Sequence, residues 1–217
     1  MKLLKESSLM NDIIWAIYYF LAVIVLGLII EMFSLNDIES IIVSRIQDIF
    51  VHALPIQIFV TITYLGDLRF LIAISLLHFV YSYYKSRGIS KSIRLLVFLA
   101  LVTLFTYFLK ELFSRERPHL YSWNIISYTD DRDFSFPSGH VSRSLGAYSI
   151  ILNSTKIWKK IILFVLVTLI SLSRIVLGAH YFTDVVGALF LSLFIERLIN
   201  ISLNILCSKF KTVLEKM

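Results

Sequence analysis

Residues 157–205 read IWKKIILFVLVTLISLSRIVLGAHYFTDVVGALFLSLFIERLINISLNI, and this stretch decides the fold because it joins two long apolar runs through a short polar junction. Each run is close to the ~20 residues that a helix needs to cross a bilayer. We therefore predict spans at 157–177 and 182–205. Polar residues in such surroundings are costly and indicate a function. Those at the junction are Ser173, Arg174, His180 and Asp184.

Similar apolar runs recur along the rest of the chain. The 217 residues are 58% hydrophobic and only 17% charged, whereas soluble domains average about 25% charged residues. Further spans are predicted at 13–33, 67–84, 92–113 and 138–153. The sequence thus predicts an all-α, polytopic membrane bundle of about six transmembrane helices. We expect 1–217 to be a single domain, with the motif-bearing core at about 92–205.

Residues 37–54 have a different pattern from the spans. Isoleucines recur there at helical spacing on one side, and Glu39, Ser40, Gln47 and Asp48 fall on the other. This pattern predicts an amphipathic helix, which either lies in the membrane interface or packs along the bundle.

Basic residues gather at one set of connections, which orients the predicted bundle. With six spans, all of these connections fall on one side, and the positive-inside rule makes that side cytoplasmic. Membrane orientation thus accounts for the net charge of +6, and we expect no nucleic-acid partner. The protein is predicted to lie in the cell membrane with both termini cytoplasmic. The residues concerned are Lys2, Lys5, Lys85, Arg87, Lys91, Arg94, Lys156, Lys159, Lys160, Lys209, Lys211 and Lys216.

Three polar clusters border the connections on the opposite, extracytoplasmic side. His180 and Asp184 are four residues apart, so on a helix they share a face. The carboxylate would fix the imidazole tautomer and leave the other nitrogen free as a nucleophile, although such a pair is also common as a structural hydrogen bond.

The other two clusters suit the binding of an anion. Pro137–Ser138–Gly139–His140 opens an apolar helix, and helix N-termini bind anions through free amides. Lys110 and Arg117 are seven residues apart, or two helical turns. Taken singly, these residues are also explained by helix capping and by a lysine reaching the interface.

Taken together and in this order, the three clusters resemble the type-2 phosphatidic acid phosphatase superfamily. Its patterns K-x6-R-P, P-S-G-H and S-R-x5-H-x3-D read here as Lys110 to Pro118, Pro137 to His140 and Ser173 to Asp184. The match covers about residues 110–184.

The resemblance implies a role for each matching residue. His180 would attack phosphorus, with Asp184 orienting it, and His140 would protonate the leaving oxygen. The phosphoryl oxygens would be held by Lys110, Arg117, Ser138, Gly139 and Arg174. The resemblance implies no metal and no cofactor.

Some charged residues near the clusters are not explained by the family pattern. Arg143 follows His140 by three residues and points to the same side of the helix. It is interpreted either as a second phosphate or headgroup contact or as a buried partner of Glu111 or Asp67. His119 is a candidate for the entrance of the site. Solvated charges are expected at Arg115, Glu116, Asp130, Asp131, Arg132 and Asp133.

The function predicted from the sequence is hydrolysis of a lipid phosphate at the outer face of the membrane. Candidate substrates are a polyprenyl diphosphate such as undecaprenyl diphosphate, phosphatidic acid, phosphatidylglycerol phosphate and phosphorylated lipid A. Membrane lipids are the other expected partners, and the sequence leaves the oligomeric state open. Two alternatives remain, a lipid phosphotransferase that uses the same histidine and a non-enzymatic anion-binding membrane protein.

Overall fold

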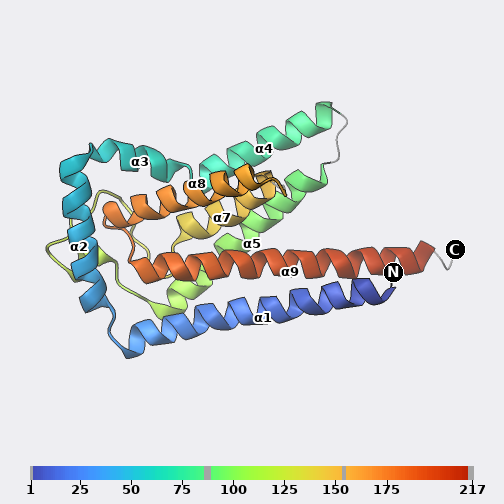
Figure 1. The fold of residues 1–217 in the computed structure, drawn as a ribbon, viewed down its shortest axis with the longest axis horizontal. Helices are drawn as coiled ribbons and strands as arrows, with labels where there is room; N and C mark the ends of the chain where they lie inside the picture. The colour runs from blue at the N-terminus through green and yellow to red at the C-terminus, as the bar shows by residue number, and fades with distance from the viewer. Residues whose placement is uncertain (1, 86–88, 153–154, 215–217) are drawn as a thin grey trace.

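A computed structural model describes residues 2–85, 89–152 and 155–214, and over these ranges the chain forms nine helices and no strand (Figure 1). The all-α class predicted from hydropathy is confirmed. The helices are α1 (Lys2–Met32), α2 (Asn36–Ala53), α3 (Ile56–Tyr64), α4 (Leu68–Tyr84), α5 (Ser90–Phe113), α6 (Pro118–Tyr121), α7 (Gly139–Leu152), α8 (Ile157–Val176) and α9 (Phe182–Leu214).

Each of the six predicted spans corresponds to a helix; in chain order these are α1, α4, α5, α7, α8 and α9. Most of the predicted boundaries agree with the helix ends within two residues. By length and hydropathy alone, three described segments qualify for crossing a membrane, Leu9–Met32, Ser90–Tyr121 and Phe182–Leu206. The pair α2 and α3 would add a fourth if counted as one span, but it is bent by 110°. The other helices are shorter or more polar, because α7 has 14 residues and α8 contains Lys159, Lys160 and Arg174. The count of six is therefore approximate.

The core of the bundle lies where α7 packs against α5, α8 and α9. Gly146 allows the close approach of α7 to α5, because a Cβ at this position would lie 2.0 Å from the ring of the fully buried Phe98. On the other side of the bundle, α1 packs along α9, and Phe20 contacts Phe194 with ring centroids 5.1 Å apart. The outer faces of these helices expose many large apolar side chains, as expected for a surface in contact with lipid.

The two ends of the bundle differ in the elements that they contain. Both termini lie at one end of the long axis, and the C-terminal end of α4 points to the same side (Figure 1). The turn between α8 and α9 lies at the opposite end, together with α2 (Figure 1). The short helix α6 contacts α2. Several of the basic residues that predicted the orientation, among them Lys2, Lys5, Arg87 and the lysines of the tail, lie outside the residues whose side chains the structure describes.

Helix α2 runs across the end of the bundle and not along it (Figure 1). Most of its isoleucines face outward, with Ile38, Ile41 and Ile49 all more than 60% exposed, whereas Ile46 is half-buried against the core. Its polar residues Glu39 and Gln47 are buried against the protein. The helix is therefore amphipathic as predicted, but its polar side faces the protein and its apolar side is available to lipid.

Candidate functional site

The turn between α8 and α9 fixes the position of His180. Gly178 ends α8 with a φ of +70°, and a Cβ on it would lie 2.5 Å from the carbonyl oxygen of Ile126, so glycine is required for both conformation and space. The chain then turns back, and the amide nitrogens of Ala179 and His180 donate to the carbonyl oxygen of Arg174. As a result, the His180 side chain lies directly beside the C-terminal turn of α8.

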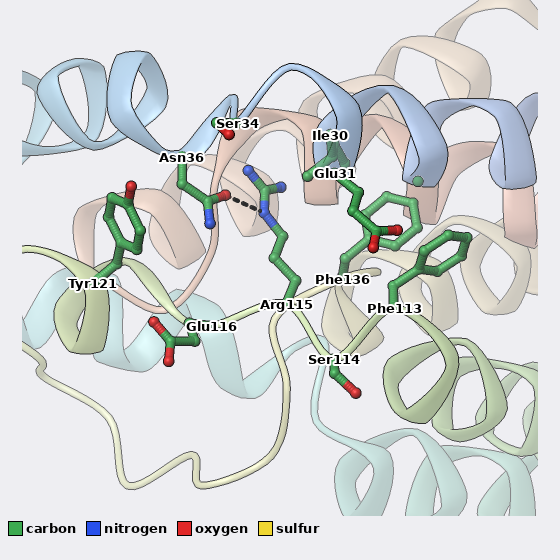
Figure 2. Close-up of a pocket in the computed structure, with 11 residues that line it drawn as sticks. Ile30, Glu31, Ser34, Asn36, Phe113, Ser114, Arg115, Glu116, Tyr121 and Phe136 are labelled. Carbon is green, nitrogen blue, oxygen red and sulfur yellow. Dashed lines mark hydrogen bonds between the residues drawn. The ribbon is translucent and has the colours of Figure 1, made fainter.

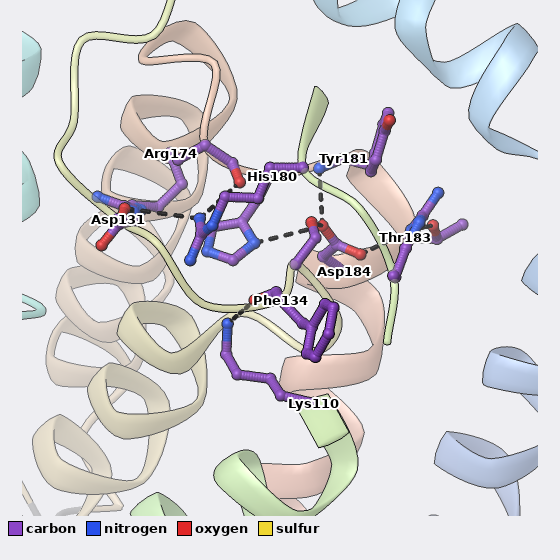
Figure 3. Close-up of polar contacts among 12 residues, drawn as sticks. Lys110, Asp131, Phe134, Arg174, His180, Tyr181, Thr183 and Asp184 are labelled. Carbon is purple, nitrogen blue, oxygen red and sulfur yellow. Dashed lines mark hydrogen bonds and ion pairs between the residues drawn. The ribbon is translucent and has the colours of Figure 1, made fainter. Parts of the chain in front are cut away.

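Asp184, in the first turn of α9, holds the His180 ring (Figure 3). Its Oδ2 lies 3.3 Å from His180 Nδ1 and accepts hydrogen bonds from the Tyr181 amide at 2.9 Å and from the Ser135 hydroxyl. Its Oδ1 accepts from Arg115 Nη1 at 2.6 Å. The carboxylate is fully buried. This arrangement makes Nδ1 the protonated nitrogen of His180 and leaves Nε2 with its lone pair.

The electrostatic surroundings keep His180 neutral. Burial lowers the pKa of its imidazole to about 3, although the hydrogen bond to Asp184 favours the protonated form. The nearby positive charges of Arg117 and Arg174 lower this pKa further. At neutral pH the histidine is thus a neutral nucleophile beside a buried carboxylate.

Three cationic side chains from three parts of the chain converge next to His180. Arg174 comes from the last turn of α8 and is buried, and its Nη1 donates to Thr63 Oγ1 of α3 at 3.0 Å. Arg117 precedes α6, and its Nη1 donates to the Ala179 carbonyl at 2.8 Å. Lys110, from the last turn of α5, donates to the Phe134 carbonyl. The structure thus brings the cations predicted from the sequence to one point.

The N-terminal end of α7 completes the site. Ser138 lies next to Asp184, because its amide donates to the Asp184 carbonyl at 3.1 Å. The Ser138 hydroxyl is buried without a hydrogen-bond partner among the described residues. Gly139 and His140 follow in the first turn of α7 and line the same cavity as His180. An unpaired hydroxyl at a helix N-terminus is suited to donate a hydrogen bond to an anion.

These side chains surround a cavity of about 160 Å³. Its lining residues are Thr103, Thr106, Tyr107, Lys110, Arg117, Asp131, Asp133, Gly139, His140, Arg143, Arg174 and His180. His119 is not among them, and its Nδ1 lies 3.2 Å from the Gly178 carbonyl oxygen, where it supports the turn that carries His180.

Arg143 reaches this cavity without a carboxylate partner. Within the described ranges no ion pair joins it to Glu111 or Asp67, and its buried Nε has no hydrogen-bond partner. The Asp67 carboxylate instead caps α4 by accepting from the Arg69 amide at 2.8 Å. No direct ion pair of Arg143 with Glu111 or Asp67 forms among the described residues, although the Asp67 carboxylate is near enough to stabilise its charge. The cavity thus has a fourth cation.

The acidic segment before α7 was expected to be a solvated loop, but two of its carboxylates bind the cations of the site. Figure 3 shows one of them, Asp131, beside Arg174. Asp131 pairs with Arg174 and lies 3.5 Å from Arg117. Asp133 lies 3.0 Å from Lys110 and 2.5 Å from Arg117. Burial opposes ionisation of both carboxyls, but the adjacent cations outweigh it and hold the pKa of each below its usual range.

Arg115 is another residue that the sequence analysis assigned wrongly. It was expected to be a solvated charge, yet it is only 5% exposed and contacts Asp184. The sequence offered one indication that Arg115 lies near the site, because it is only two residues before Arg117 in the segment that follows α5. Its partner Glu39 comes from α2, and no local pattern connects these two positions.

The comparisons with known proteins agree with this geometry. The sequence profile of the PAP2 superfamily matches residues 91–204, more than half of the chain. The protein therefore belongs to the PAP2 superfamily, a family of membrane lipid phosphatases. It is a multi-pass membrane protein. No curated protein sequence matches it at a significant level.

Two solved structures resemble most of the fold. One is a transmembrane PAP2-type phosphatidylglycerolphosphate phosphatase from Bacillus subtilis, which is 26% identical with a TM-score of 0.73, over 85% of this chain and 94% of that chain. The other is LpxE from Aquifex aeolicus, 25% identical with a TM-score of 0.61, over 72% of this chain and 92% of that chain.

The carboxylates on the cations lead to a prediction about anion binding. We expect the double variant Asp131→Asn/Asp133→Asn to bind inorganic phosphate at least ~10-fold more tightly, since a hydrogen bond between charged groups contributes about 1.5–3 kcal/mol and phosphate no longer has to displace one. The measurement is the thermal midpoint of the purified protein in detergent against phosphate concentration. Without phosphate, the double variant should have a lower thermal midpoint than the wild type, and phosphate should raise its midpoint by more.

The control is Asp130→Asn, because Asp130 is exposed and in the described structure forms no ion pair. Unchanged or weaker phosphate binding by the double variant would show that the two carboxylates do not compete with the anion.

Proposed function

We propose that this protein is an integral membrane lipid phosphatase that hydrolyses a lipid phosphomonoester or diphosphate through a phosphohistidine on His180. One observation carries the proposal. His180 Nδ1 is bound to Asp184 at 3.3 Å, so its free Nε2 is left for a cavity lined by four cations. These cations are Lys110, Arg117, Arg143 and Arg174. Membership of the PAP2 superfamily supports the same reaction class.

In the first step, Nε2 of His180 attacks phosphorus and the bond from phosphorus to the lipid oxygen breaks. The imidazole becomes positively charged when it bonds to phosphorus, and the buried Asp184 carboxylate stabilises that charge. The leaving oxygen takes a proton from the imidazolium form of His140, which lines the same cavity and which the negative charge of a bound phosphate would favour. In the second step, water replaces His180 on phosphorus and returns a proton to His140.

The cations bind the phosphoryl oxygens as negative charge develops on them. Arg117 and Arg174 present planar guanidinium groups suited to two oxygens each, and Lys110 supplies a point charge. The free hydroxyl of Ser138 and the amide of Gly139 add neutral donors. In the absence of substrate, Asp131 and Asp133 bind the same cations, so the phosphoryl group would take the positions of these carboxylates. The proposed mechanism needs no metal and no cofactor, because these side chains supply the positive charge.

We propose that the site faces the extracytoplasmic side and that residues 1–217 act as one domain in the cell membrane. The support is the separation of the two ends of the bundle, since both termini lie at the end opposite to the turn that carries His180 (Figure 1). Basic connections at the first end favour a cytoplasmic location for it. A lipid would reach the site from the outer leaflet, beside the exposed isoleucines of α2.

The candidate substrates remain those of the sequence analysis, and one solved relative is a phosphatidylglycerolphosphate phosphatase. A transferase would use the same phosphohistidine but would need an acceptor other than water. A non-enzymatic anion-binding protein would need the cations without the pair of His180 and Asp184. The buried, hydrogen-bonded pair favours an enzyme over the anion-binding protein. Hydrolase and transferase share this pair and are separated by whether phosphate release needs an added acceptor.

The first prediction from this function concerns His180. We expect the purified protein to release inorganic phosphate from at least one of four lipids, phosphatidic acid, phosphatidylglycerol phosphate, a polyprenyl diphosphate and phosphorylated lipid A, with no acceptor added. Replacing His180 by alanine should reduce the rate by about 10⁴-fold or more, because it removes the nucleophile.

His52→Ala is the matched control, since His52 is exposed and bonds only to the Asp48 carbonyl among the described residues. Both variants should elute as folded protein in detergent. Near-normal phosphate release by the His180 variant would end the assignment, and release that requires an added acceptor would favour the transferase.

The second prediction concerns Arg143, whose guanidinium lines the cavity without a partner carboxylate. If it binds a second phosphate, Arg143→Leu should lower kcat/KM for diphosphate lipids by ~10-fold or more, as expected for a lost hydrogen bond between charged groups. Monophosphate lipids should be affected much less. Arg69→Leu, which removes an exposed cation next to the N-terminal cap of α4, serves as the control. An equal loss for both classes of lipid would contradict a role in diphosphate preference.

A further inference from the structure

Arg115 belongs to neither the nucleophile nor the cations around the cavity. It follows α5, where Ser114 takes a left-handed conformation, and its own carbonyl oxygen accepts from the Ser135 amide at 2.8 Å. Its side chain approaches Asp184 from behind and contacts Oδ1, whereas His180 contacts Oδ2. Arg115 therefore acts on His180 only through Asp184, and it does not line the cavity beside His180.

The guanidinium of Arg115 is held from several directions. Nη1 donates to Asp184 Oδ1 at 2.6 Å and to Thr183 Oγ1 at 2.7 Å. Nη2 donates to Glu39 Oε2 at 2.6 Å, and Nε donates to Asn36 Oδ1 at 2.9 Å. The plane also lies over the ring of Tyr181, 4.0 Å from its centroid. Such a set of contacts fixes the orientation of a planar cation more firmly than a single ion pair does.

Glu39 anchors this arrangement from α2. Its Oε1 accepts from the Thr183 amide at 2.9 Å, and its Oε2 accepts from the Thr183 hydroxyl at 2.6 Å in addition to Arg115. Glu39 therefore ties Arg115 and the first turn of α9 to one point. This explains why the polar side of α2 faces the protein.

The charges of the three side chains depend on one another. The side chains of these residues, Arg115, Glu39 and Asp184, are at most 8% exposed, so water does little to screen their charges. One cation balances two carboxylates, and a buried charge without its partner is strongly unfavourable. Removing the cation would leave Asp184 and Glu39 to repel one another on either side of Thr183.

We propose that Arg115, anchored by Glu39 of α2, is a positioning residue that fixes the carboxylate plane of Asp184 so that Oδ2 orients His180 for attack. This inference rests on the proposed phosphatase function and assigns Arg115 and Glu39 no contact with substrate. Replacing a group that orients a reacting residue through a second residue commonly lowers activity by about 10–100-fold.

A second cavity makes this proposal testable by chemical rescue. Arg115 forms part of the wall of a cavity of about 290 Å³ between α1, the start of α2 and the segment after α5 (Figure 2). Figure 2 shows Arg115 reaching across toward Asn36, with Glu116 on the same segment and Phe113 at the end of α5. Truncating Arg115 would extend this cavity to Asp184, with room for a guanidinium ion in the position of the lost side chain.

The experiment measures inorganic phosphate release from the four lipids named above by the purified full chain in detergent. We expect Arg115→Ala to lower kcat about 10–100-fold and to leave KM and stabilisation by inorganic phosphate unchanged, because the cations of the cavity are intact. Millimolar guanidinium chloride should restore much of kcat, and sodium chloride at the same concentration should not. Glu39→Gln should lower kcat less and should not respond to guanidinium.

The matched control is Glu116→Gln, which changes an exposed neighbour on the wall of the same cavity and should retain the wild-type kcat. A wild-type kcat for Arg115→Ala, or a loss that guanidinium does not restore, would overturn the proposal. If the alanine variant does not fold, Arg115→Lys and Glu39→Gln provide the test. A wild-type kcat in both variants would refute the positioning role of Arg115. Absence of activity in the wild type on all four lipids would defeat the proposed function instead.

Discussion

Four positive side chains converge at one end of an apolar bundle, and their mutual repulsion has to be balanced by negative groups. In the structure that balance comes from Asp131 and Asp133, which bind Lys110, Arg117 and Arg174. Only Arg143 forms no direct ion pair among the described residues of the site. Because these cations repel one another in a medium of low dielectric constant, the site is suited to take up an anion. A lipid phosphate would supply that anion, and the two carboxylates would return to water.

The negative charge of Asp184 is balanced by residues that take no part in the replacement of carboxylates by phosphate on the cations. Arg115 and Glu39 bind it on the side away from the cavity, so its contact with His180 does not depend on whether the cations hold a carboxylate or a phosphate. Helix α2 thereby has two functions in the fold. Its inner side supports the dyad, and its outer side presents isoleucines to the lipid from which a substrate would come.

The residues that the sequence predicted best are those whose relation is local. His180 and Asp184 are four residues apart, and the apolar runs specify the two helices between which His180 lies, so both could be found by spacing and hydropathy. The partners of Arg115, Asp131 and Asp133 could not be found in this way. Each pair joins positions far apart in the chain, and the path of an irregular segment such as the one before α7 has no periodicity to reveal it. The inward polar side of α2 was missed for a similar reason, because an amphipathic pattern identifies two faces without saying which one meets protein.

The central claim is that His180 is the nucleophile, and trapping the covalent intermediate tests it most directly. Enzyme mixed with lipid labelled in its terminal phosphate and quenched within one turnover should carry a label that is stable in base and lost in acid. Peptide mapping should locate the label on His180, and the His180→Ala variant should carry none. A label that survives acid, or one that persists in the variant, would contradict the account.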